Sequence, residues 1–236
     1  MSDPKIEGYE FKSGFKGMAA DAGSDQTMFK GVHWGKAMMW IFLLSDTFIF
    51  SCFLISYMKG RGSTPIDWPN PSKVFALEVG GVSVPLLLIA IMTFVLITSS
   101  GTMALAVKFG YERKRKLCGW LLLATALGGL TFVGMQAFEW SKLIHEGVRP
   151  WTNPFGAEQF GSFFFMITGF HGTHVSIGVI FLSIYAYKTF AGHYDTGKKG
   201  WFTSIKGDYV EIEILGLYWH FVDLVWVFIF AFFYLW

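Results

Sequence analysis

Five long stretches of this 236-residue sequence contain almost no charged residues, and only Asp46 and Asp223 interrupt them. The hydrocarbon core of a bilayer is ~30 Å thick, and about 20 helical residues are needed to cross it. Each stretch is long enough to do so. The sequence therefore predicts five transmembrane helices, at about 37–58, 79–107, 117–141, 159–187 and 212–236.

The predicted fold class is all-α, a polytopic membrane helical bundle. The polar segments between the stretches are short and leave no room for a second domain, so we expect a cytosolic N-terminal tail, 1–35, and one transmembrane domain, 36–236. Only 15% of the residues are charged, against roughly 25% in soluble domains. The net charge of +2 gives no basic field for nucleic acid. Cys52 and Cys118 are too few for a cysteine-based metal cluster or a disulfide framework.

Lys and Arg predict the orientation. If the N-terminus is cytoplasmic, 14 of the 19 Lys and Arg residues lie on the cytoplasmic side. Positive charge accumulates on that side of membrane proteins, so we expect the N-terminus inside and the C-terminus outside. The basic run 113–116 has two interpretations: a topology signal, which we favour, or a site for anionic lipid head groups.

Several ionisable or polar side chains fall within the predicted helices, where each costs several kcal/mol unless it is paired or faces a polar interior. His171 and His174 are three residues apart, and therefore neighbours on one helix face. The helix at 212–236 carries its polar residues as a single stripe with Gly216. The candidate site residues are Asp46, Gln136, Glu139, His171, His174, Glu213, His220 and Asp223.

Three hypotheses explain these residues. They can form a structural network in which His and carboxylate side chains bond across helices. They can help a proton to enter or cross the membrane. Alternatively, His171, His174, His220 and a carboxylate can bind a metal ion, although two His at this spacing are a weak metal signal. The residues alone leave all three hypotheses open.

Two motifs resemble those of subunit III of haem–copper oxidases, the cytochrome c oxidase family. The first is Phe165-Met-Ile-Thr-Gly-Phe-His-Gly-Thr-His174, and the second is Glu213-Ile-Leu-Gly-Leu-Tyr-Trp-His-Phe-Val-Asp223. The segments 44–48 and 129–139 are similar to the family segments that hold a buried carboxylate and precede an outer loop. The resemblance covers about residues 34–236.

The resemblance implies a non-catalytic partner of subunit I in a proton-pumping terminal oxidase of a bacterial plasma membrane. No cofactor or metal is expected in this chain, because haem and copper lie in partner subunits; bound phospholipid is expected. The implied partners are subunit I directly, subunit II and a small subunit IV, with membrane lipids around them and a respiratory supercomplex as the larger assembly. The implied tasks are to stabilise subunit I, to sustain proton uptake and to protect the oxidase during turnover.

Two departures from the family pattern matter. Asp46 stands where the family usually has Glu, and its side chain is one methylene shorter. By the resemblance, Asp46 is the proton-uptake candidate. The common family form has seven helices, and this chain resembles the short five-helix bacterial form. We expect cytochrome c as the electron donor of the complex, with a quinol oxidase as the alternative. A stand-alone membrane metalloenzyme built on His171, His174, His220 and Asp223 is a distant alternative.

Overall fold

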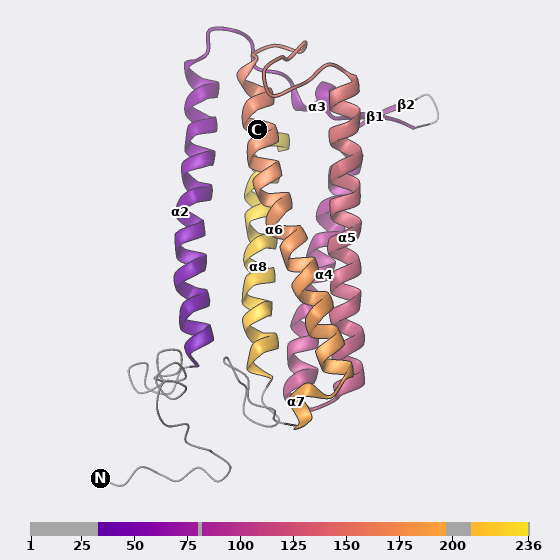
Figure 1. Cartoon of the computed structure of the whole chain (residues 1–236). Coiled ribbons are helices and arrows are strands. Elements are labelled where there is room, and N and C mark those ends of the chain that lie inside the picture. Colours follow the sequence, from indigo (N-terminus) through magenta and orange to yellow (C-terminus); the bar gives the residue numbers. More distant parts are fainter. Residues whose placement is uncertain (1–32, 80–81, 197–208, 236) are drawn as a thin grey trace, which may run out of the picture.

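The computed structural model describes residues 33–79, 82–196 and 209–235. Five long helices run side by side in it (Figure 1). All five are long and apolar enough to cross a membrane, which confirms the predicted number of spans and the helical fold class. They are α2 (Trp34–Ser63), α4 (Leu87–Tyr111), α5 (Arg115–His145), α6 (Gln159–Phe190) and α8 (Val210–Phe230), which continues as a π-helical turn, Ala231–Leu235.

The five helices alternate in direction, so the start of α2 and the end of α8 lie at opposite ends of the molecule (Figure 1). We call the end where α2 begins the lower end and the other the upper end. Two short helices, α3 (Pro71–Val74) and α7 (His193–Thr196), lie at the upper and lower ends respectively. The tail predicted at 1–35 lies outside the described residues except for its last three. The cytoplasmic side remains a prediction.

The predicted start of the second helix at residue 79 is wrong. The chain first forms an antiparallel hairpin of β1 (Ala76–Val79) and β2 (Val82–Pro85), in which Ala76 pairs with Pro85, and α4 begins only at Leu87. Valines at 79, 82 and 84 favour strand geometry, and Pro85 has no N–H to continue a ladder. Leu86 then has a left-handed backbone with φ of 59°, which separates the hairpin from the helix.

Most of the helices extend two to five residues beyond at least one of their predicted ends. Helix α4 continues to Tyr111, and α5 begins at Arg115. The segment left between the two predicted helices was 108–116, and in the structure it is only 112–114. The long helices therefore include charged residues in their terminal turns. In a bilayer, head groups and water would solvate the charges of these terminal turns. A search for uncharged stretches therefore ends each helix too early.

Four of the helices form a bundle, and the fifth lies against its side. Helix α5 packs between α4 and α6, and α8 contacts both α4 and α6. Helix α2 contacts α8 and α6 and stands at the left of the bundle in Figure 1. Much of α2 is exposed, with large apolar side chains such as Leu44 and Phe48 on its surface.

Two tryptophans of α8 hold the bundle together. Trp219 is fully buried and donates its indole N–H to Oγ of Ser99 on α4 at 3.1 Å. One end of its ring lies so close to Gly129 of α5 that a Cβ atom there would collide with it. Trp226 likewise donates to Oγ1 of Thr93, at 3.0 Å. Glycine on α5 thus permits the close approach that helices use in lipid.

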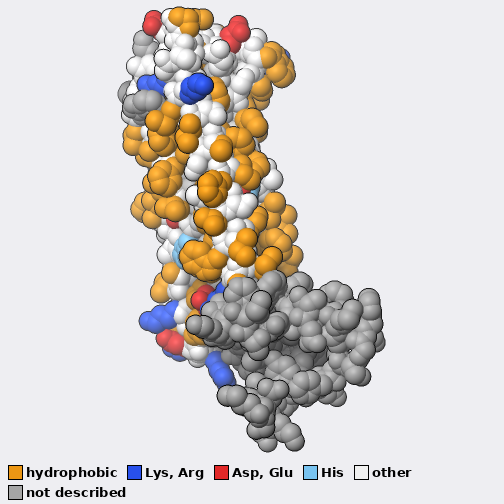
Figure 2. Space-filling view, turned by 90° about the vertical axis from the view of Figure 1, so that its left-hand side faces the viewer, with side chains coloured by type: hydrophobic (Ala, Val, Ile, Leu, Met, Phe, Trp, Pro, Cys, Tyr) orange, Lys and Arg blue, Asp and Glu red, His pale blue; other side chains and the backbone are white. Residues whose placement is uncertain are grey.

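The outer surface agrees with a membrane location. Figure 2 shows hydrophobic side chains over the middle of the face on the α2 side, with most Lys, Arg, Asp and Glu side chains near the two ends. Large apolar side chains are exposed on every long helix, among them Trp40, Phe94, Leu130, Ile180 and Leu224. Such a belt would be an aggregation liability in water and is the expected surface in lipid.

Candidate functional site

Asp46 and His174 form a pair that joins α2 to α6 near the middle of both helices. Oδ2 of Asp46 lies 3.4 Å from Nε2 of His174, and the Asp46 residue is only 3% exposed. The other ring nitrogen of His174, Nδ1, lies 2.8 Å from the carbonyl oxygen of Phe170. A carbonyl only accepts, so Nδ1 carries a proton in this arrangement.

The contact between the two side chains is a close approach and not a formed hydrogen bond. Oδ2 of Asp46 is buried and has no hydrogen-bond partner among the described residues, although Nε2 of His174 lies 3.4 Å away. With Nδ1 protonated, a hydrogen bond here would need one further proton, on Nε2 or on the carboxyl group. Both groups can take up a proton, and either location of that proton would give the pair the same net charge.

Aromatic rings from α2 and α6 pack around this pair. The rings of Phe50 and Phe170 lie 5.7 and 4.7 Å from the His174 ring, between centroids. The hydroxyl of Tyr218, from α8, donates to the backbone carbonyl of His174 at 2.9 Å. The pair therefore lies where α2, α6 and α8 meet, surrounded mainly by apolar groups.

His171 has different surroundings, although it lies on the same helix one turn away. It is 1% exposed, and its ring stacks on Trp226 with centroids 5.4 Å apart. Phe132 and Phe50 meet the ring edge-on. Neither ring nitrogen has a hydrogen-bond partner in the described part of the chain. His171 is thus an aromatic packing residue of the core in this structure.

The recorded contacts of His220 and Asp223 are with α4 and not with His171 or His174. Nδ1 of His220 lies 2.6 Å from Oγ of Ser100, on α4, and Ser100 also lies beside the carboxyl group of Asp223. All three side chains are partly exposed. They form a polar cluster in the seam between α4 and α8.

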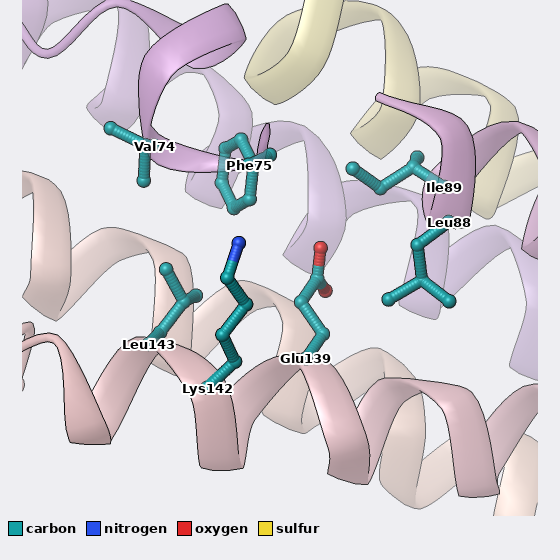
Figure 3. Close-up of a pocket in the computed structure, with 7 residues that line it drawn as sticks. All are labelled: Val74, Phe75, Leu88, Ile89, Glu139, Lys142 and Leu143. Carbon is teal, nitrogen blue, oxygen red and sulfur yellow. The ribbon is translucent and has the colours of Figure 1, made fainter. Parts of the chain in front are cut away.

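Gln136 and Glu139 form a further cluster towards the upper end. Nε2 of Gln136 donates to Oε2 of Glu139 at 2.8 Å, and the hydroxyl of Tyr234 donates to both carboxylate oxygens at 3.2–3.3 Å. Glu139 also lines a small cavity of about 10 Å³. Figure 3 shows the side chains of Glu139 and Lys142 extending from α5 into this cavity, opposite Phe75.

Glu213 lies at the lower end, where it fastens three helices. Oε2 of Glu213 is 2.7 Å from Nζ of Lys36 on α2, and the hydroxyl of Tyr111, at the end of α4, donates to the same carboxylate. Glu213 therefore belongs to a different part of the molecule from His220 and Asp223, although all three lie on one stripe of α8.

The metal hypothesis requires His171, His174, His220 and Asp223 to face one another, and the structure does not bring the four together. The four residues occupy three separate environments: the Asp46 pair, the Trp226 stack and the Ser100 cluster. Within residues 33–79, 82–196 and 209–235, no three His, Cys, Asp or Glu side chains are grouped so as to hold a metal ion. The metalloenzyme hypothesis thus lacks the ligand set that it assumed.

The partners of these residues were not visible in the sequence. Ser100, Tyr218, Trp226 and Tyr234 complete the clusters, and each comes from a helix other than that of its partner or from a distant part of the chain. Spacing along one helix indicates which residues share a face. It does not indicate which helix that face meets.

Comparison with known proteins places the chain in a family. The family model for cytochrome c oxidase subunit III matches residues 13–236. The probable quinol oxidase subunit 3 of Staphylococcus aureus strain USA300 is 30% identical over 199 residues, covering 83% of this chain and 86% of the relative. The protein of the same description from Staphylococcus saprophyticus is 29% identical over 215 residues, covering 91% and 94%. With five apolar spans and a match over nearly its whole length, this chain belongs to the subunit III family of haem–copper oxidases.

Proposed function

We propose that this chain is the non-catalytic subunit III of a terminal oxidase in a bacterial plasma membrane, and that the complex takes its electrons from quinol. The match of the family model to residues 13–236 carries the proposal. The names of the two staphylococcal relatives favour quinol over cytochrome c. Haem and copper are assigned to partner subunits I and II, and O₂ is reduced to water there.

The role of this chain is to stabilise subunit I and to sustain proton supply to it. Asp46 and His174 support the second task, because two groups that can each take up a proton lie 3.4 Å apart near the middle of their helices. A buried pair of this kind can hold a proton without adding net charge to the membrane interior. We assign these two residues as a proton-holding pair, with bound phospholipid beside the exposed face of α2.

The test uses the whole complex, isolated through an affinity tag on this chain. O₂ consumption is measured with a soluble quinol and, separately, with reduced cytochrome c, and the haem spectrum of the sample is recorded. We expect co-purified haem and quinol-driven O₂ consumption. Consumption driven by cytochrome c alone would overturn the assignment of the donor. A sample with no other oxidase subunit and no haem would overturn the proposal as a whole.

A further inference from the structure

A cavity of about 180 Å³ lies between α4 and α5, near the middle of both helices. Phe94, Thr98 and Thr102 line it from α4, and Ala124 and Gly128 line it from α5. The last two are four residues apart and therefore share one helix face, where their small side chains leave the space unfilled. Phe94 is 71% exposed and Thr98 is exposed as well, so the cavity opens to the outside of the bundle.

The hydroxyl groups that line the cavity are already bonded within the chain. The hydroxyl of Thr98 donates to the carbonyl of Phe94, and that of Thr102 donates to the carbonyl of Ser99, both at 2.8 Å. The hydroxyl of Ser99 donates to the carbonyl of Leu96 at 2.6 Å. A buried water needs two to four polar partners, and these bonds leave no hydroxyl proton for one. The cavity is therefore suited to an apolar occupant.

The helix faces that border the cavity continue to the lower end of the molecule. On α4, Leu105 and Phe109 follow Thr98 by seven and eleven residues, which keeps them on its face. On α5, Leu117 lies seven residues before Ala124, on the same face as that residue. The distance from Phe109 to Thr98 along α4 is about 16 Å, roughly half of the ~30 Å bilayer core. An acyl chain that starts at the lower membrane surface can therefore reach the cavity.

Positive charge surrounds the lower end of these faces. The segment 108–116 contains five Lys and Arg residues against one acidic residue, Glu112, which gives it a net charge of +4. The Nζ atoms of Lys108 and Lys114 lie 5.9 and 5.2 Å from the centre of the Phe109 ring. Lys114 also pairs with Glu112 at 2.7 Å, but one carboxylate cannot neutralise five cations. Such a cluster at a membrane surface attracts anionic lipid head groups.

We propose that α4 and α5 bind one anionic phospholipid from the leaflet at the lower end. Its phosphate group contacts Lys108 and Lys114, and one acyl chain runs past Leu105 into the cavity beside Ala124. Charge alone would attract any anion, and an apolar cavity alone would accept any lipid chain; an anionic phospholipid satisfies both at this spacing. The site is separate from the lipid assigned to α2, because α2 contacts α8 and α6. The inference requires only that the chain spans a membrane.

The first test compares two lipids in nanodiscs that hold the purified complex. The discs contain phosphatidylcholine with a minor fraction of phosphatidylglycerol. A diazirine crosslinker is placed on the acyl chain of phosphatidylglycerol in one sample and, at the same molar fraction, of phosphatidylcholine in the other. We expect phosphatidylglycerol to label Phe94 and Thr98 several-fold more strongly, as read by mass spectrometry of the peptides. Equal labelling by the two lipids would indicate ordinary surrounding lipid only, and it would overturn the proposal, as would no labelling by either.

The second test removes charge from the site of the head group. The double variant Lys108→Gln, Lys114→Gln leaves three basic residues in the segment 108–116, so the positive-inside signal is retained. Lys59→Gln, an exposed lysine at the upper end of α2, is the control for loss of charge elsewhere. We expect the double variant to lower the excess labelling by phosphatidylglycerol about tenfold and Lys59→Gln to leave it unchanged. Undiminished labelling in the double variant would contradict the proposal.

The third test fills the cavity. Ala124→Phe places a ring in the space, whereas Leu130→Phe puts the same ring on another face of α5, at a residue that is 57% exposed. We expect Ala124→Phe to reduce labelling of Phe94 and Thr98 several-fold and Leu130→Phe to have no effect. Equal labelling in the two variants would show that the acyl chain does not lie in the cavity. If Ala124→Phe does not accumulate, the comparison of lipids and the lysine variants still decide the question.

Discussion

Nε2 of His174 lies 3.4 Å from Oδ2 of Asp46, and this contact links α2 to the four-helix bundle at mid-height. The link matters because α2 is the least buried of the five spans. In its most apolar 18-residue segment 17% of the residues are buried, against 28–44% in the other four spans. An isolated Asp at this depth would be costly. The histidine thus explains how the chain can keep a carboxyl group in its most lipid-exposed helix.

The first prediction concerns this pair. Asp46→Asn retains a side-chain oxygen that can accept from His174, so we expect the complex to assemble normally. The amide cannot take up a proton, and we expect a modest fall in O₂ turnover that grows over repeated cycles. Haem content and time-resolved O₂ consumption of the purified complex measure the two effects.

Asp46→Leu is the comparison for assembly. It leaves Nε2 of His174 without its acidic partner, which we expect to cost about 1–3 kcal/mol of stability and to lower the yield of complex. Equal loss of assembly in the Asn and Leu variants would show that Asp46 is purely structural.

The second prediction concerns His171 and separates a hydrogen-bonding role from a packing role. If His171 were a hydrogen-bonding residue, Gln would be a milder substitution than Leu. Its ring instead stacks on Trp226 and has no hydrogen-bond partner in the described chain. We therefore expect His171→Phe to be the mildest change, His171→Leu to be intermediate and His171→Gln the most damaging, because Gln buries an unpaired amide.

The thermal stability of the purified complex measures this order. Phe conserves the aromatic contact and roughly the volume, so its effect should stay below about 1.5 kcal/mol. A variant order with Gln mildest would restore the hydrogen-bonding interpretation and indicate a partner of His171 beyond the described residues.

The contrast between fold and site shows what a single sequence can determine. The five spans were predictable because the cost of burying charge in lipid acts on each segment independently. The hairpin before α4 was not, because residues 79–85 carry no charge and so continue the uncharged stretch of the helix that follows. For the site, spacing placed His171 and His174 on neighbouring parts of one face. The two histidines have different surroundings because His171 stacks on Trp226 and His174 lies beside Asp46, and both of these partners come from other helices.

The third prediction concerns topology. Ser72, Glu112 and Glu158 are exposed residues outside the long helices. We expect cysteine at 72 or 158 to react with a membrane-impermeant thiol reagent in intact cells, and cysteine at 112 to react only after the cells are opened. The charge asymmetry motivates this order. Cys52 and Cys118 are replaced beforehand, so that only the introduced cysteine can react. Labelling of position 112 in intact cells would show that the orientation is opposite to the predicted one.

The last prediction tests the packing of α8 against α5 with two glycines of the same helix. A Cβ at Gly129 would collide with the Trp219 ring and with Val179, whereas no atom lies within 4 Å of a Cβ at Gly134. We expect Gly129→Ala to destabilise the protein by about 1–3 kcal/mol, since the fully buried Trp219 ring has little room to move. Gly134→Ala should be neutral or stabilising by up to about 1 kcal/mol, because Ala is the better helix former. Melting temperatures of the two purified complexes measure the difference, and equal values would mean that the contact between Gly129 and Trp219 does not limit the packing of these helices.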